Sequence, residues 1–304
     1  MSTLVSEEFD RRLRSTAMAW LDRRITPENP VVTRAELQNF HFEGQRISLA
    51  DRGRGIRKPE GFTAAISILT SYKRRGKPAP YNDTMGPDGF LRYKHQSNPQ
   101  DHTNKALREA LRRQLPLIWF FGVNEGVFHP IYPVWVVADE PEHSQVAVAL
   151  NAEQLELSES AHLSPAEKHY SERVSKARLH QPVFRQRVLL AYNSRCAICR
   201  LQHPSLLDAA HILPDREERS LPEVSNGLAL CKIHHAAYDA NILGIRSDLV
   251  VHIRADILQE IDGPMLKHGL QEMHNVPLTT PHASINKPNR DFISERYERF
   301  LAAK

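Results

Sequence analysis

Cysteine is scarce in this sequence, because the chain of 304 residues has three and all of them lie between residues 196 and 231. A secreted disulfide scaffold is therefore excluded, and the clustering is typical of a metal-binding knuckle in a reducing compartment. No apolar stretch reaches the roughly 18 residues that a membrane-spanning helix needs. The first ten residues also lack the basic and apolar segments of a secretory signal. We expect a soluble, cytoplasmic protein with no membrane contact.

The charge of the chain is weakly positive, at +4, and the excess lies in the N-terminal half. Residues 1–150 hold 21 Lys and Arg against 17 Asp and Glu. Such an excess is compatible with a surface that faces phosphates, although most charged segments are simply solvated. A length of 304 residues and a hydrophobic content of 41% are sufficient for two domains, each with its own core.

The order of apolar patterns predicts an α+β protein with two unlike domains. The first domain, residues 1–155, is expected to form a curved, mainly β sheet or barrel with helices. A polar linker, partly helical and with a helix starting at Ser164, is expected over 156–180. The second domain is expected to occupy 181–304. The expected strands are 47–49, 64–69, 117–121, 134–137, 146–148 and 249–253, and the expected helices are 10–24, one capped by Thr33, 104–111, 181–195 and 291–303.

Two short pairs of metal-ligand residues predict a structural zinc site. Zinc prefers four nitrogen or sulfur ligands in a tetrahedron, and such pairs are the usual way in which one chain supplies them. The pairs are Cys196 with Cys199 and Cys231 with His234, the second pair on one face of a helix. Two alternatives remain open at this point: His203 could replace His234, or the cysteines could be ordinary buried residues.

A second group of residues suggests a catalytic centre beside the zinc site. His211 ends a strand, Asn226 precedes a helix, and His235 and Asp239 share one face of that helix. A neutral imidazole can accept a proton from water near pH 7, while a divalent cation stabilises charge on a phosphate. These residues could therefore surround one hydrated divalent cation.

Residues 181–245 resemble the zinc-stapled branch of the HNH, or ββα-metal, nuclease family. The resemblance implies that His211 is the general base, that Asn226 orients the loop or the base, and that His235 binds a catalytic Mg²⁺, Mn²⁺ or similar ion. Many relatives carry Asp or His immediately before the base, where this chain has Ala210. Asp208 could substitute as a ligand, and Asp239 could add another or form only a helix-end salt bridge.

The N-terminal half contains a candidate pocket for a flipped base. Such a base needs two aromatic faces and an acceptor for its exocyclic amine, which Tyr81, Tyr93 and Asp83 would supply. The layout over residues 45–150 resembles the PUA-like SRA domain, which flips and reads 5-methylcytosine. Asp88 could replace Asp83 and Tyr72 could replace Tyr81, or each tyrosine could simply pack in the core.

Basic residues near this pocket either are simply solvated or contact DNA phosphates. For the group as a whole we favour contact with phosphates. They are Arg52, Arg54, Arg57, Lys58 and the segment 73–77.

Together the two resemblances imply a modification-dependent restriction endonuclease of the McrA-like or TagI-like kind. Its partner would be double-stranded DNA that carries 5-methylcytosine or a related base. Because one HNH site cuts one strand, we expect a homodimer. The rivals are a methylated-DNA reader that does not cut, and an HNH nuclease whose N-terminal domain binds protein or RNA. A cysteine nucleophile is disfavoured because zinc accounts for all three cysteines.

Overall fold

The structure is a computed structural model that describes residues 4–51, 53–72, 85–160, 162–215, 217, 219–220 and 222–303. The chain divides into two compact units, Met1–Val183 and Phe184–Lys304, and the division falls within one helix. Among the residues described, no helix combines the length and the apolar character that crossing a membrane requires.

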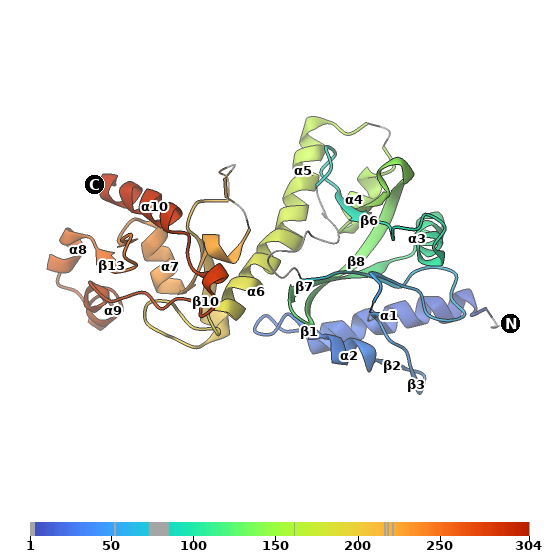
Figure 1. Ribbon diagram of the computed structural model, residues 1–304, viewed down its shortest axis with the longest axis horizontal. Helices are drawn as coiled ribbons and strands as arrows, with labels where there is room; N and C mark the ends of the chain where they lie inside the picture. Colours follow the sequence, from blue (N-terminus) through green and yellow to red (C-terminus); the bar gives the residue numbers. More distant parts are fainter. Residues whose placement is uncertain are drawn as a thin grey trace. The chain divides into compact units, whose positions relative to one another are not determined.

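The elements of the two units are numbered in chain order, and Figure 1 labels most of them. In the first unit they are α1 (Glu7–Arg24), β1 (Val32–Thr33), α2 (Arg34–Gln38), β2 (His41–Phe42), β3 (Gln45–Arg46), β4 (Ile56–Arg57), β5 (Ser67–Thr70), β6 (Leu91–Lys94), α3 (His102–Arg112), β7 (Leu117–Asn124), β8 (Val127–Glu140), β9 (Gln145–Ala149), α4 (Ala152–Leu157) and α5 (Pro165–Ser175). A π-helical turn (Lys176–His180) leads into α6 (Gln181–Ala191), and the second unit continues with β10 (Leu207–His211), β11 (Gly227–Cys231), α7 (Lys232–Asp239), β12 (Leu243–Ile245), β13 (Val251–Ile253), α8 (Ala255–Gln259), α9 (Pro264–Gly269) and α10 (Arg290–Ala302).

A curled sheet organises the first unit. Its strands run in the order β4-β5-β7-β8-β9-β6, and β1 also pairs with β8. β8 is long enough to pair with β7 along its first half and with β9 along its second, where the register shifts between Val136 and Ala138. Such an irregularity increases the local twist of a strand, so β8 can belong to both parts of the curled sheet.

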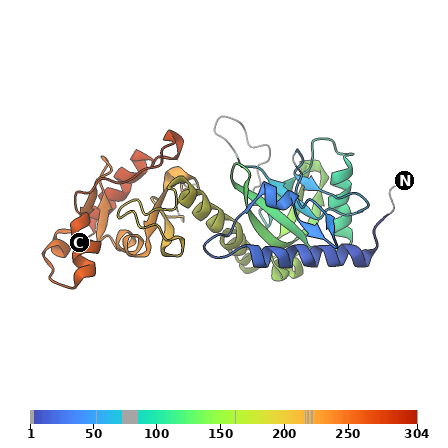
Figure 2. The ribbon, with the colours of Figure 1, turned by 90° about the horizontal axis from the view of Figure 1, so that it is seen from below.

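One face of this sheet is covered by α1, which runs along it (Figure 2). Leu13, Ala17 and Leu21 recur at helical spacing on α1 and are buried against Ile118 and Phe120 of β7. The predicted caps are confirmed, because Thr33 and Ser164 each form a capping box at the start of a helix. Residues 47–49, expected to be a strand, are not one; Leu49 is nevertheless buried in the core.

The segment expected to be a linker packs on the first unit through polar contacts. Gln154 donates to Ser171 Oγ at 2.8 Å, and Ser175 donates to the carbonyl oxygen of Gly89 at 3.0 Å. Ser171 and Ser175 are fully buried, which explains why a polar composition did not make this segment a flexible tether.

The second unit contains an antiparallel hairpin followed by a helix. β10 pairs with β11 from Leu207 opposite Cys231 to His211 opposite Gly227, and α7 follows directly. Two local predictions are wrong: Asn226 precedes a strand and not a helix, and Cys231 is the N-cap of α7 and not a residue within it. Residues 228–230 are entirely apolar and buried, so no alternation marked them as a strand.

Candidate active site and metal cluster

Four side chains converge at the base of the hairpin into a group that could hold a metal ion. Their ligand atoms, from Cys196, Cys199, Cys231 and His234, all lie within 4.8 Å of one another. His234 Nδ1 lies 3.4 Å from Cys196 Sγ and 3.1 Å from Cys231 Sγ. The alternative ligand, His203, is exposed and contacts Ser205 instead. Three sulfurs and one imidazole form a donor set that suits Zn²⁺.

One thiol of this cluster is held in its thiolate form, whereas contacts with the other two sulfurs raise the pKa of the Cys199 thiol. Hydrogen bonds from Cys199 and Cys231 hold the pKa of the Cys196 thiol well below its usual value. His234 Nε2 lies 2.8 Å from the carbonyl oxygen of Gly269 in α9, which fixes the tautomer with Nδ1 free to bind metal. A second hydrogen bond of this kind commonly orients a ligating histidine.

His211 lies at the end of β10, with its ring held by an aromatic neighbour. Phe184 of α6 stacks on the imidazole at a centroid distance of 4.0 Å and an angle of 13°. Burial lowers the pKa of His211, and the nearby carboxylates of Asp215 and Asp239 oppose this only in part. The imidazole is therefore neutral at pH 7 and can accept a proton.

The buried side chain of Asn226 forms hydrogen bonds with the connection between β10 and β11. Its Oδ1 accepts a hydrogen bond from the Leu213 amide at 2.9 Å, and its Nδ2 donates to the Leu213 carbonyl at 3.3 Å and to Ser220 Oγ at 3.0 Å. Asn226 is 1% exposed. Its side chain therefore holds the backbone two residues after His211 and does not face solvent.

His235 lies between two carboxylates, one at each ring nitrogen. Its Nδ1 is 3.5 Å from Asp208 Oδ2, and its Nε2 is 3.3 Å from Asp239 Oδ2. Lys232 Nζ also contacts Asp208 Oδ2, and Arg185 Nε lies 3.6 Å from Asp208 Oδ1. Although burial raises the pKa of Asp208, the contacts with Lys232 and His235 together outweigh it and the net shift is downward. Asp208 is thus an ionised carboxylate that already has cationic partners.

The candidate base pocket is described only in part. Tyr81 and Asp83 lie outside the described residues. Tyr93 is fully buried, packs edge-on against Trp119 at 5.7 Å and donates to the Leu69 carbonyl. In this conformation neither face of the ring is open to a base. Asp88, the alternative acceptor, is held by both terminal nitrogens of Arg92.

The alternative aromatic, Tyr72, is described and is half-buried at the end of the segment that follows β5.

Basic residues of the first unit have partners of their own. Arg57 pairs with Asp51 at 2.9 Å, and Lys58 donates to the Phe62 carbonyl. Arg54 is half-exposed and lies near His102 and Asp101. Arg52 and residues 73–77 lie outside the described residues. Arg54 is therefore the described residue of this group with the most freedom to reach a phosphate.

Comparison with known proteins identifies the second unit. The family model for HNH endonucleases matches residues 196–246, which contain the metal cluster, the hairpin and α7. The chain carries an HNH endonuclease domain. It is therefore a nuclease, and the domain implies that the protein binds DNA.

Two solved restriction endonucleases are similar to the chain at low identity. One is described as a modification-dependent TagI restriction endonuclease, at 15% identity and a TM-score of 0.29 over 88% of this chain and 90% of that one. The other is the type IV phosphorothioation-dependent restriction endonuclease ScoMcrA, at 14% identity and a TM-score of 0.25 over 62% of this chain and 51% of that one. No curated protein matches the sequence.

Three residues of the HNH domain's site have no motif that could have revealed them. Phe184 reaches His211 from a helix, Asp215 follows it in an irregular connection, and Lys232 pairs with Asp208 across the hairpin. The one available signal was the adjacency of Lys232 to Cys231, but a lone surface lysine is usually solvated.

Proposed function

We propose that this HNH domain hydrolyses phosphodiester bonds with His211 as the general base. The observation that carries the proposal is the neutral, Phe184-stacked imidazole of His211 beside the His235 and Asp239 pair. A carboxylate and an imidazole nitrogen are ligands that Mg²⁺ or Mn²⁺ accepts, and such an ion would stabilise charge on the scissile phosphate. Zn²⁺ at the Cys₃His cluster would have only a structural role.

The two carboxylates beside His235 would have different roles. A ring can bind a metal through one nitrogen while the other nitrogen donates to a carboxylate. Asp239 is 66% exposed and acts electrostatically on His211, so Nε2 of His235 and Asp239 form the better ligand pair. Asp208, which already has Lys232 as a partner, would then orient His235 through Nδ1.

We further propose that the first unit selects DNA with 5-methylcytosine or a related modified cytosine. The support is the pattern Tyr81, Asp83 and Tyr93 on a domain with a curled sheet. Tyr93 would have to leave its contact with Trp119 for a base to stack on it, or the base would use another face. A homodimer would allow both strands to be cut.

The burial of Tyr93 favours a second candidate function, an HNH nuclease that cuts without regard to modification.

The deciding experiment compares a cytosine-methylated plasmid with its unmethylated twin, each incubated with the full chain and Mn²⁺ or Mg²⁺. We expect the methylated plasmid to be degraded and the unmethylated one to survive. Equal degradation of both would remove the modification-reading role and leave the second candidate. Binding of the methylated plasmid without cleavage of either would instead indicate a reader that does not cut.

A further inference from the structure

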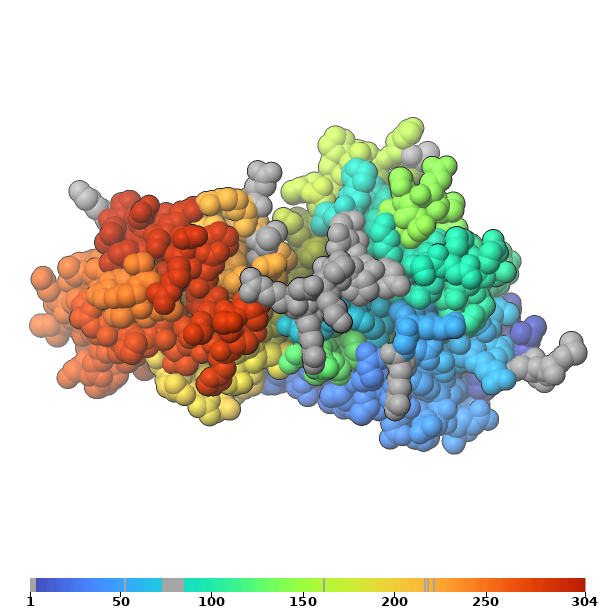
Figure 3. Space-filling model, in the orientation of Figure 1, coloured from blue at the N-terminus to red at the C-terminus, as the bar shows by residue number. Residues whose placement is uncertain are grey.

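The C-terminal helix α10 lies outside the matched residues 196–246 but packs directly on them. Ile293 and Phe300 are buried in the core of the second unit. Gly244 of β12 allows this close approach, because a Cβ atom there would lie 2.5 Å from the Phe300 ring. The remaining residues of α10 are partly or fully exposed, and atoms of the C-terminal part of the chain lie at the surface in Figure 3.

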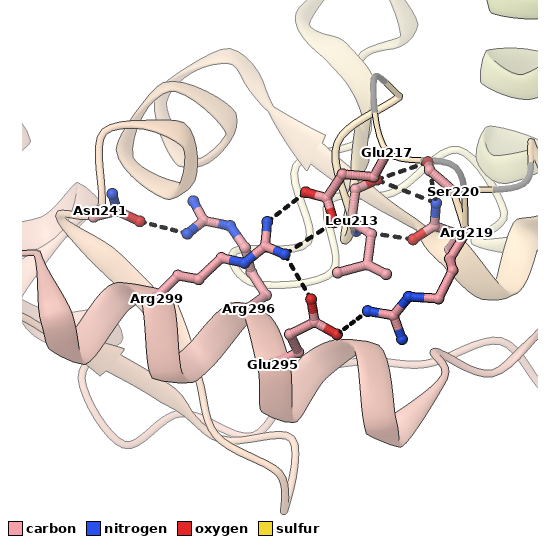
Figure 4. Close-up of polar contacts among 9 residues, drawn as sticks. Leu213, Glu217, Arg219, Ser220, Asn241, Glu295, Arg296 and Arg299 are labelled. Carbon is pink, nitrogen blue, oxygen red and sulfur yellow. Dashed lines mark hydrogen bonds and ion pairs between the residues drawn. The ribbon is translucent and has the colours of Figure 1, made fainter.

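Arg299 of α10 contacts the connection that follows His211. Its guanidinium binds both carboxylate oxygens of Glu217, with Nη2 to Oε2 at 2.9 Å. It also contacts Glu295 one turn earlier, at 2.6 Å, and Glu295 in turn pairs with Arg219. Figure 4 shows Arg299 between the two carboxylates. This network holds the connection at Glu217, in addition to the bonds that Asn226 makes to Leu213 and Ser220.

Arg296, on the same helix, contacts the end of α7. Its Nη2 donates to the Tyr238 carbonyl at 2.6 Å, and its Nη1 donates to Asn241 Oδ1. The guanidinium also lies 4.7 Å from the centre of the Tyr238 ring. Tyr238 immediately precedes Asp239, so Arg296 anchors the turn of α7 that follows His235.

One helix therefore holds both segments that carry the proposed catalytic residues. We propose that Arg299 and Arg296 are positioning residues of the nuclease site: α10 fixes the separation between the His211 connection and the His235 turn. This inference rests on the proposed roles of His211 and His235. A bidentate arginine–carboxylate pair fixes geometry well, yet partly exposed pairs contribute little to stability. Removing Arg299 should therefore change the position of the proposed catalytic residues more than it changes the stability of the fold.

The test is the single-turnover rate constant for cleavage, measured with enzyme in saturating excess over DNA. Once the enzyme saturates the DNA, this rate constant does not depend on the fraction of folded enzyme. We expect Arg299→Gln to lower this rate about tenfold, since small misplacements of reacting groups are costly. DNA affinity and the melting temperature should stay near those of the wild type. Glu217→Gln should give a similar loss, and the double variant should be no slower than either single variant. Arg246→Gln, which breaks an exposed ion pair with Asp248, is the matched control and should cleave normally.

Three results would overturn the proposal. The first is an unchanged cleavage rate in Arg299→Gln, and the second is losses that add up in the double variant. The third is a loss confined to DNA affinity, which would mean that Arg299 contacts phosphates directly. Failure of the proposed active site itself is distinguished by His211→Ala, which would then cleave at the wild-type rate.

Discussion

Replacing Asn226 by Ala tests how the HNH hairpin holds its proposed base. The variant removes three hydrogen bonds, and it leaves the Leu213 amide, in a fully buried residue, without its acceptor. A buried polar group without a partner costs about 1–3 kcal/mol. We expect the free energy of unfolding of the second unit to fall by about 2 kcal/mol. For a domain of this size the melting temperature then falls by roughly 6–10 °C.

The cleavage rate of the same variant should also fall, and by more than the loss of folded protein can explain. The Leu213 backbone lies two residues from His211, so a freed connection no longer fixes the imidazole relative to the phosphate. A displacement of about 1 Å costs about 100-fold in rate. The assays are thermal unfolding and the single-turnover rate, measured well below the melting temperature.

Ser220→Ala is the graded control, because it removes the hydrogen bond from Asn226 and the one that Ser220 donates to the Leu213 carbonyl, but leaves the Leu213 amide bonded. It should lose about 1 kcal/mol, less than Asn226→Ala. If Asn226→Ala melted and cleaved like the wild type, the reasoning about the connection would be refuted.

Other parts of the domain give three further predictions. Because burial holds the pKa of His211 below its ordinary value of 6.5, the base is more than half neutral at pH 6.5. The cleavage rate should therefore decline only below pH 6.5. A cleavage rate that has already fallen to half its maximum above pH 6.5 as the pH is lowered would contradict this. Cys196→Ser should reduce bound zinc from about one ion per chain and lower the melting temperature, as metal analysis and calorimetry would measure; a full zinc content in this variant would contradict the Cys₃His site. Gly244→Ala should cost about 1–3 kcal/mol by pressing on Phe300, whereas Gly263→Ala, with open space around it, should be nearly neutral in thermal unfolding.

Local signals allowed much of the helical structure to be predicted. Thr33 and Ser164 are followed three residues later by Glu, and this short-range pattern alone defines a capping box. The metal cluster could be predicted in the same way, because two ligand residues a few positions apart in the sequence can reach the same metal ion.

Features that depend on distant partners could not be found from the sequence. The strand β11 reads as a continuous apolar run, which does not distinguish a buried strand from a helix. The burial of Tyr93 depends on Trp119, which lies on another strand of the curled sheet. The contact between Arg299 and Glu217 joins residues far apart in the sequence, so no local pattern could reveal it.

The central claim is that His211 is the base of a metal-dependent nuclease, and the most direct test is DNA cleavage by His211→Ala beside the wild type. The substrate is a cytosine-methylated plasmid with Mn²⁺, and folding is verified by zinc content and melting temperature. We predict that the variant retains its zinc and its fold but loses cleavage by about 100-fold or more, the usual contribution of a general base. Wild-type cleavage by a fully folded His211→Ala protein would contradict the assignment.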